Sequence, residues 1–232
     1  MVTPFSVSVV IPAYNEEQTV GGVIEDTLKT LESADHPYEI IVVNDGSTDK
    51  TGLIASQYKT TLLTNSKNMG KGYSLRRAFQ EANGEIIVTI DSDGEHRPKE
   101  IMDLIEPLLN GTDIVGGSRF LGASKDFTTK LNQVGNKLFN LAILLLTGVQ
   151  VTDSQSGFRA FKKKILEELK LQSNGFEIET EIMVKCLING FDFKEKPVSC
   201  ERRRHNVSKI KIIKDGIRIL KTIIRSTFTN TP

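Results

Sequence analysis

Residues 85–96 read EIIVTIDSDGEH, an apolar run that passes directly into a cluster of acids around a glycine. The run at residues 85–90 has the composition of a buried β-strand. Asp91 and Asp93 then follow at the carboxyl end of that strand, and Gly94 allows the chain to turn there. The stretch therefore predicts a strand whose end carries a charged site.

Strands and helices alternate on both sides of this stretch. Further strands are expected at residues 7–11, 39–43, 61–64 and 113–116, and helices at 16–31, 49–58, 72–82 and 98–109. Continuous apolar strands that alternate with helices predict an α/β fold, with a mostly parallel central sheet covered by helices on both faces. The second half is less regular, with helices expected at 130–146, 163–169, 177–189 and 211–225, a polar loop at 153–159 and an added strand at 193–198.

Composition limits the partners and the compartment. The 232 residues carry 30 Lys and Arg against 29 Asp and Glu, so net charge gives no reason to expect a nucleic-acid partner. Two cysteines without CxxC spacing predict free thiols in a reducing compartment. The longest apolar run, residues 138–149, is far shorter than the roughly 20 residues that span a bilayer. With no signal peptide expected either, we predict a cytoplasmic protein.

Three polar motifs follow three of the expected strands. They read PAYNE at residues 12–16, NDGSTD at 44–49 and DSDGEH at 91–96. Ligands of parallel sheets bind beyond the carboxyl ends of the strands, so we expect the three motifs to line one crevice.

The acids of the third motif suit a divalent cation. Mg²⁺ and Mn²⁺ prefer oxygen ligands, and they commonly bind one or two carboxylates together with substrate phosphates. Asp91 and Asp93 are the candidates, and a cation there would act as a Lewis acid on a diphosphate leaving group. His96 is a possible third ligand, although we expect it to be a loop residue.

Other residues near the strand ends are candidates for contact with a nucleotide or phosphate. Asp45 can accept hydrogen bonds from a base or ribose, while Ser47 or Thr48 caps the following helix. Lys71, within NMGKG at 68–72, can approach a phosphate from a helix start, although a flexible turn explains the motif equally well. The GxxxxGK[ST] pattern is missing, which argues against a P-loop NTPase. Arg119 is a candidate clamp for phosphate, which guanidinium binds bidentately.

From residue 202 to residue 225 the chain is rich in Lys and Arg and has few acids. Residues 202–209 form a dense cationic run without an aromatic residue, which favours phosphates over single-stranded nucleic acid. The helix expected at 211–225 is basic and amphipathic, so it either lies in a membrane interface or packs on the domain. The helix at 130–146 has the same two interpretations.

Taken together, these segments resemble glycosyltransferase family 2, and within it the dolichyl-phosphate mannose synthase-like and polyprenyl-phosphate glycosyltransferases. The matching pieces occur in the family's order across residues 5–210: VVIPAYNE, IIVVNDGSTD, NMGKG, DSDGEHRP, GGSRF, DSQSGFRAF, GFEIETEI and RRRHNVSK. The resemblance implies a Rossmann-like GT-A fold in a single domain, 1–232. Its parts would be a nucleotide-sugar-binding half (1–120), an acceptor-side half (121–210) and a basic amphipathic tail (211–232).

The resemblance also implies roles for individual residues. Donor binding is expected from Pro12, Tyr14, Glu16, Val43, Asp45, Lys71, Asp91, Ser92, Asp93, Arg203 and Lys209. Metal binding is expected from Asp91, Asp93 and Glu95, where many relatives have Gln in place of Glu95. The catalytic set is Asp93, Arg119 and Arg203, with Arg204 as the alternative to Arg203 if the register of the arginine run shifts by one. The acceptor phosphate is expected to meet Arg119, Ser156 and Arg159.

The expected activity is a metal-dependent, inverting transfer from GDP-mannose or a UDP-sugar to a dolichyl or polyprenyl phosphate. The enzyme would be peripheral, at the cytoplasmic face of a membrane. A phosphate acceptor is already an anion and needs no general base, whereas a sugar hydroxyl does. The alternative is therefore a family-2 enzyme that glycosylates a hydroxyl with Asp153 as base, in which case Ser156 and Arg159 either bind phosphate or brace the loop.

Overall fold

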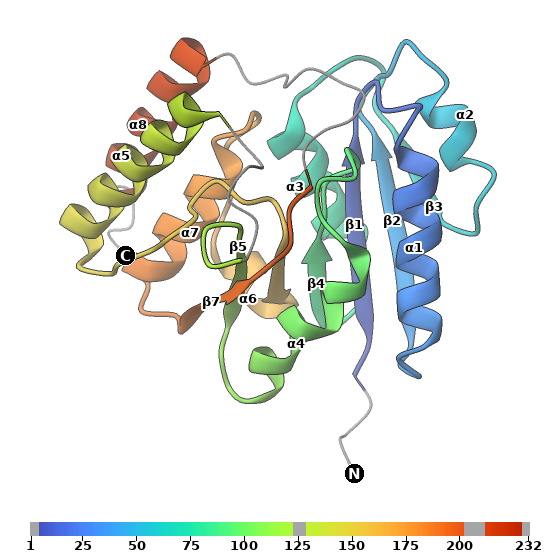
Figure 1. Ribbon diagram of the computed structural model, residues 1–232, viewed down its shortest axis with the longest axis horizontal. Coiled ribbons are helices and arrows are strands. Elements are labelled where there is room, and N and C mark those ends of the chain that lie inside the picture. The colour runs from blue at the N-terminus through green and yellow to red at the C-terminus, as the bar shows by residue number, and fades with distance from the viewer. Residues whose placement is uncertain (1–4, 123–128, 202–211, 229–232) are drawn as a thin grey trace.

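A computed structural model describes residues 5–122, 129–201 and 212–228 of the chain. Its centre is a seven-stranded sheet with strand order β3-β2-β1-β4-β6-β5-β7 (Figure 1). The strands are β1 (Val7–Ala13), β2 (Tyr38–Asn44), β3 (Thr61–Thr64), β4 (Ile86–Thr89), β5 (Ile114–Ser118), β6 (Arg159–Lys162) and β7 (Phe193–Pro197).

The predicted mostly parallel sheet is confirmed, with one strand that the sequence did not reveal. Pairs β1–β2, β2–β3, β1–β4 and β5–β7 are parallel, whereas β6 runs antiparallel between β4 and β5. The sequence at β6 is RAFK, four residues that follow a polar loop, too short to show the periodicity of a strand.

Helices cover both faces of the sheet, as the alternating pattern predicted. They are α1 (Val20–Glu32), α2 (Thr51–Ala55), α3 (Lys71–Glu81), α4 (Ile101–Leu109), α5 (Lys130–Thr147), α6 (Lys163–Glu168), α7 (Ile178–Ile188) and α8 (Ile212–Phe228). A 3₁₀ turn, Pro98–Glu100, precedes α4. One buried cluster joins Val9 and Ile11 of β1 to α1 and α4. The other joins Val10, on the opposite face of β1, to α3, α6 and α7.

Helices α5 and α8 form an outer layer beyond α7, at one side of the molecule (Figure 1). Ile143 of α5 and Ile219 and Ile223 of α8 are buried together with Met183 and Val184 of α7. The packing interpretation of α8 is therefore correct for its inner face. In the described part of the chain, no helix is both long and apolar enough to cross a bilayer.

The start of α2 differs from the expectation that Ser47 or Thr48 caps it. The helix begins at Thr51, and Asp49 Oδ1 accepts the hydrogen bond from Thr51 N at 3.0 Å. Ser47 Oγ instead accepts a bond from Asn15 N at 3.0 Å. The two hydroxyl residues lie too early in the chain to reach the amides of α2, and the capping prediction is wrong.

We predict that Cys186 does not react with alkylating reagents in the folded protein. It is fully buried, and this burial raises the pKa of its thiol to about 12. At pH 8 the thiolate fraction, and hence the rate with iodoacetamide, should be roughly a thousandfold below that of an ordinary cysteine. Mass spectrometry of the native and the urea-unfolded chain tests this. Because the folded pKa is raised, the thiol's contribution to stability is complete below about pH 8.5 and is lost as the pH rises toward 12.

Candidate active site

The ends of β1, β2 and β4 are tied to one another by hydrogen bonds from their polar motifs. Ser92 Oγ, in the turn after β4, donates to Pro12 O at 2.9 Å. Asn15, with φ of 51°, accepts a bond from Thr48 N at 2.8 Å through Oδ1. Gly94 also has positive φ, 74°, as the turn through the acids requires. The three motifs therefore meet at one edge of the sheet, as predicted, and that they line one crevice stays a prediction.

Asp45 holds the loop before α3. Its Oδ1 accepts hydrogen bonds from Asn65 Nδ2 at 2.7 Å and from Met69 N at 2.8 Å, and its Oδ2 accepts one from Gly70 N at 2.8 Å. The carboxylate is buried, so contact with a nucleotide would add to this network.

The other residues expected in a donor pocket surround the same strand ends. Pro12 and Val43 are partners in the register of β1 and β2. The Val43 side chain is buried in the core, so contact with a ligand there would fall to its main chain. Glu16 is buried and accepts a hydrogen bond from Thr19 Oγ1 at 3.3 Å, while Tyr14 is half-buried.

Lys71 lies between two carboxylates. Its Nζ is 2.6 Å from Asp91 Oδ1 and 2.9 Å from Glu179 Oε1. Burial acts to lower the pKa of Lys71, but the two carboxylates outweigh it and raise that pKa above its ordinary value. In this arrangement Lys71 is a charged partner of Asp91.

The glycines beside Lys71 serve close packing. A Cβ on Gly72 would lie 2.4 Å from Ser173 O, and one on Gly70, which has φ of 100°, would lie 2.3 Å from Asn174 O. The loop at 68–72 thus lies directly against residues 173–174, and a side chain at either glycine would prevent this close approach.

The described residues contain no group of three His, Cys, Asp or Glu side chains arranged to hold a metal ion. Asp91 is engaged by Lys71, while Asp93, which is buried, accepts a hydrogen bond from Glu95 N at 3.0 Å. Two carboxylates two residues apart on a tight turn fit Mg²⁺ or Mn²⁺ if donor phosphates and water supply the other oxygens. Because Asp91 is already paired with Lys71, Asp93 and Glu95 are the ligands that we carry forward, and the full set of three stays a prediction.

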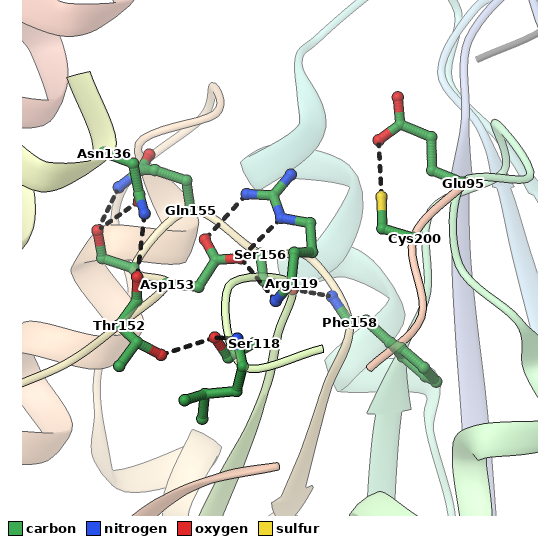
Figure 2. A network of polar contacts seen from close by, with 12 residues as sticks. Glu95, Ser118, Arg119, Asn136, Thr152, Asp153, Gln155, Ser156, Phe158 and Cys200 are labelled. Carbon is green, nitrogen blue, oxygen red and sulfur yellow. Dashed lines mark hydrogen bonds and ion pairs between the residues drawn. The ribbon is translucent and has the colours of Figure 1, made fainter. Parts of the chain in front are cut away.

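Arg119 lies just past the end of β5 and pairs with Asp153 (Figure 2). Its Nε is 2.7 Å from Asp153 Oδ2 and its Nη2 is 2.9 Å from Asp153 Oδ1, a bidentate pair. The main-chain N of Arg119 donates to Oδ2 as well, at 3.1 Å. Burial alone would lower the pKa of Arg119, but Asp153 outweighs it and raises that pKa, so the guanidinium is always charged.

The loop that carries Asp153 is held from two sides. Glu195 of β7 accepts hydrogen bonds from Asp153 N and from Thr152 N, both at 2.8 Å. Asn136 and Asn140 of α5 donate to Thr152 O at 3.1 and 2.8 Å (Figure 2 labels Asn136). Such support fixes the position of the guanidinium through the carboxylate.

Arg159 also supports the loop that carries Asp153. Its side chain is completely buried, and it donates to Ser156 O, Ser154 O and Glu179 O, each at 2.8 Å. Ser156 is also fully buried. Of the two interpretations of Ser156 and Arg159, the geometry favours bracing over contact with a phosphate.

His96 is a buried residue packed on Phe158, with ring centroids 5.2 Å apart, and it forms an isolated bridge with Cys200. Burial, with the nearby Arg119 charge, lowers the pKa of His96, so the ring is neutral at pH 7. Arg203, Arg204 and Lys209 lie outside the described residues, and their predicted roles stay predictions.

Sequence reasoning missed Glu179, Glu195 and Gly157. Glu179 joins Lys71 to Arg159, whose Nε is 3.6 Å from Glu179 Oε2. Both glutamates occur in stretches rich in other acids and lysines, so no pattern separates them from surface residues. Gly157 lies in the polar loop expected at 153–159, where a glycine is common, so the sequence did not single it out either.

Replacement of Gly157 by Ala should disturb the ion pair of Lys71 and Asp91. The new Cβ would lie 2.5 Å from Lys71 Nζ and 2.6 Å from Asp91 Oδ2, so both groups must move. We expect a loss of about 1–3 kcal/mol in the free energy of unfolding and a fall in turnover of tenfold to a hundredfold, roughly. Urea unfolding and steady-state kinetics measure the two effects.

Gly22→Ala is the matched control, because its Cβ meets nothing within 4 Å on α1. It should keep full activity and gain up to about 1 kcal/mol of stability. Equal behaviour of the two variants would show that Gly157 has no special role at the ion pair.

Comparison with known proteins identifies the family of this chain. The model of the family described as "Glycosyl transferase family 2" matches residues 8–170. Uncharacterized protein MJ1222 of Methanocaldococcus jannaschii is 34% identical over 95% of this chain and 92% of its own length. The dolichol-phosphate mannosyltransferase of Pyrococcus furiosus is 34% identical over 77% of this chain, and the aligned part covers only 52% of that enzyme.

Two further similarities concern function and fold. The UDP-N-acetylglucosamine–dolichyl-phosphate N-acetylglucosaminyltransferase of Methanococcus voltae is 29% identical over 93% of each chain. Among solved structures, glucosyl-3-phosphoglycerate synthase of Mycobacterium tuberculosis superposes with a TM-score of 0.78 over 96% of this chain and 80% of its own, at 22% identity. That likeness supports the predicted GT-A fold. From its family match and its relatives, this chain belongs to glycosyl transferase family 2 and is a glycosyltransferase.

Proposed function

We propose that this enzyme transfers a sugar, with inversion, from a nucleoside diphosphate sugar to the phosphate of a polyprenyl or dolichyl lipid. The observation that carries the proposal is the bidentate pair of Arg119 and Asp153 beside the acidic turn (Figure 2). It leaves a fixed guanidinium near the reacting groups, and it occupies the one carboxylate considered as a general base.

The donor would bind at the ends of β1, β2 and β4. Pro12, Tyr14, Glu16 and Asp45 surround the space expected for the nucleoside, and the turn at 91–95 faces the expected diphosphate. The proposal keeps Arg203, or Arg204, and Lys209 as groups that close over the diphosphate.

Mg²⁺ or Mn²⁺ held by Asp93 and Glu95 would offset the negative charge that develops on the leaving diphosphate. Lys71 holds Asp91 in place from the neighbouring loop, at 2.6 Å. Ser92 keeps the turn against β1 through its bond to Pro12 O. These contacts hold the turn that carries Asp93 and Glu95 before the donor arrives, as catalysis by preorganised charge requires.

The acceptor phosphate would meet Arg119. This nucleophile is already an anion at neutral pH, so the reaction needs no base. Both oxygens of Asp153 are within 2.9 Å of guanidinium nitrogens, and its side chain is fully buried. Both carboxylate oxygens are thus occupied by the guanidinium, which disfavours Asp153 as a base in hydrogen-bond reach of an acceptor hydroxyl.

Similarity to named enzymes supports a lipid phosphate. Two of the relatives above are named for dolichol or dolichyl phosphate. Others are named for undecaprenyl phosphate, such as an undecaprenyl-phosphate 4-deoxy-4-formamido-L-arabinose transferase of Pseudomonas fluorescens at 30% identity. Their sugars differ, so the donor stays open between GDP-mannose and a UDP-sugar. The location at the cytoplasmic face and the division at residues 120 and 210 stay predictions.

The test is a matrix of donors and acceptors with the purified chain and Mn²⁺. GDP-mannose, UDP-glucose and UDP-N-acetylglucosamine are each offered with a polyprenyl phosphate, with the matching polyprenol and with a free disaccharide. We expect a polyprenyl phosphosugar from one donor, detected by mass spectrometry, and no product from the alcohols. Transfer to the polyprenol or the disaccharide, without transfer to the phosphate, would refute the proposal.

A further inference from the structure

Helix α5 presents a continuous apolar stripe to solvent. Leu131, Val134, Leu138, Leu141 and Leu145 are each more than half exposed, and Leu145 reaches 77%. At about 100° of rotation per residue, these five side chains fall within an arc of about 80° on the helix. Exposed leucines in such a row are not scattered surface residues, and they mark a site of interaction.

Helix α8 adds to this surface beside α5 (Figure 1). Ile217, Leu220 and Ile224 are each about half exposed, although the opposite side of α8 is buried against α7. Each of these apolar residues precedes a basic one, namely Arg218, Lys221 and Arg225, all of them exposed. Long basic side chains at the border of an apolar stripe can extend to the polar layer of an interface.

Charge distinguishes the possible occupants of this face. α5 and α8 together contain six Lys and Arg residues against one acid, Asp215, which is buried. The whole chain is almost balanced, with 30 basic and 29 acidic residues. A row of leucines with an excess of positive charge matches a bilayer that contains anionic lipid, whereas a second copy of this face would repel it.

The inner side of α5 reaches the candidate acceptor site. Asn140 lies about 180° around the helix from Leu131, and with Asn136 it binds Thr152 O of the loop that carries Asp153. The helix with the exposed stripe is therefore the same helix that supports the partner of Arg119. A lipid surface against α5 would lie near the group proposed to bind a lipid's phosphate.

We propose that the exposed faces of α5 and α8, defined by Leu131, Val134, Leu138, Leu141, Leu145, Ile217, Leu220 and Ile224, dock this enzyme on an anionic bilayer surface. Docking would bring the enzyme to the lipid phosphate of the proposed transfer, and it rests on that proposed function. Binding to vesicles can nevertheless be measured without any transfer.

The experiment is flotation of the full chain with vesicles of phosphatidylcholine that contain about 30% phosphatidylglycerol. Vesicles of this composition carry enough negative charge to attract basic helices. The test variant is Leu138→Gln with Leu145→Gln. The control is Leu53→Gln on α2, which is 62% exposed, like Leu138 at 61%, but lies on the opposite side of the molecule (Figure 1). We expect the double variant to lower the partition coefficient at least tenfold, roughly, and the control to leave it unchanged.

A charge variant separates the electrostatic part. Lys137→Gln with Lys221→Gln should weaken binding to anionic vesicles several-fold, and added salt should have the same effect on the unmodified chain. Unchanged partition in the double leucine variant, or no vesicle binding by the unmodified chain, would overturn the proposal. So would self-association, seen by sedimentation velocity, that the leucine variant abolishes while vesicle binding persists.

Transfer to a short, water-soluble polyprenyl phosphate separates this proposal from the proposed function. The double leucine variant should keep its rate with that acceptor and lose rate only with a long acceptor in vesicles. Vesicle binding without any transfer would refute the function and keep the docking surface, while transfer without vesicle binding would do the reverse.

Discussion

Replacement of Asp93 by Asn is expected to lower turnover on the order of a thousandfold while the fold stays intact. Asp93 is buried at the turn after β4, and its Oδ1 accepts the bond from Glu95 N at 3.0 Å. The amide oxygen of Asn can accept the same bond, so the turn keeps its shape. What the variant lacks is the negative charge that the Asp93 carboxylate would bring to a bound divalent cation.

The measurement is turnover over a range of Mn²⁺ concentrations, with donor binding followed by calorimetry. In the unmodified enzyme Mn²⁺ should tighten donor binding, and in the Asp93→Asn variant this gain should largely disappear. Asp103→Asn, at an exposed carboxylate of α4, is the control and should change neither quantity. If the Asp93 variant kept its metal-dependent affinity and turnover, the assignment of the acidic turn to the donor diphosphate would fail.

The sequence predicted the sheet because parallel strands buried on both faces are continuous apolar runs, which can be recognised from the local sequence alone. Val7–Ala13, Tyr38–Asn44 and Ile86–Thr89 were all found this way, and their polar ends follow from the geometry of such a sheet. β6 was missed because its four residues form a strand only where β4 and β5 leave a place between them. A strand defined by its neighbours has little signal of its own.

The sequence singled out residues of the candidate site but did not predict the ion pairs between them. Asp91, Lys71, Arg119 and Asp153 were all singled out from the sequence, each with a ligand as its expected partner. The structure pairs them with one another, Asp91 with Lys71 and Arg119 with Asp153. Such pairs depend on contacts between segments far apart in the chain, 34 residues in the case of Arg119 and Asp153, and no local pattern reveals them.

The C-terminal helix shows that periodicity predicts a helix but not what its apolar residues contact. Periodicity predicted an amphipathic helix near residues 211–225 but left membrane contact and packing as rival interpretations. α8 is buried along one side, by Ile219 and Ile223, and exposes other apolar residues elsewhere. The apolar residues extend over more of the helix circumference than the contact with α7 buries. The helix therefore packs on the domain and still presents an apolar surface.

The pair of Arg119 and Asp153 should behave as one unit when either member is changed. Asp153→Asn leaves a buried guanidinium without its counter-ion, and Arg119→Met leaves a buried carboxylate without its own. Each should cost about 3–5 kcal/mol of unfolding free energy, since the stranded charge pays the penalty of burial. The double variant should be less destabilised than the sum of the two by about 1–3 kcal/mol.

A milder pair elsewhere calibrates this cycle. Asp113 pairs with Lys162 at 2.9 Å, and both side chains are about one quarter exposed. Asp113→Asn should cost about 1 kcal/mol or less and leave turnover unchanged. Urea unfolding of the four proteins of the cycle and of this control gives all of the stabilities on one scale.

Activity in the same cycle decides between the two roles of Asp153. If the aspartate positions Arg119 for an acceptor phosphate, Asp153→Asn should raise the KM for that acceptor and lower turnover about a hundredfold. The double variant should then regain stability without regaining activity, because the guanidinium that meets the phosphate is gone. A general base would behave differently: Asp153→Asn would abolish turnover at unchanged acceptor affinity and remove the acidic limb of the pH profile. The bidentate geometry leads us to expect the first outcome, with a pH profile of unchanged shape in the variant.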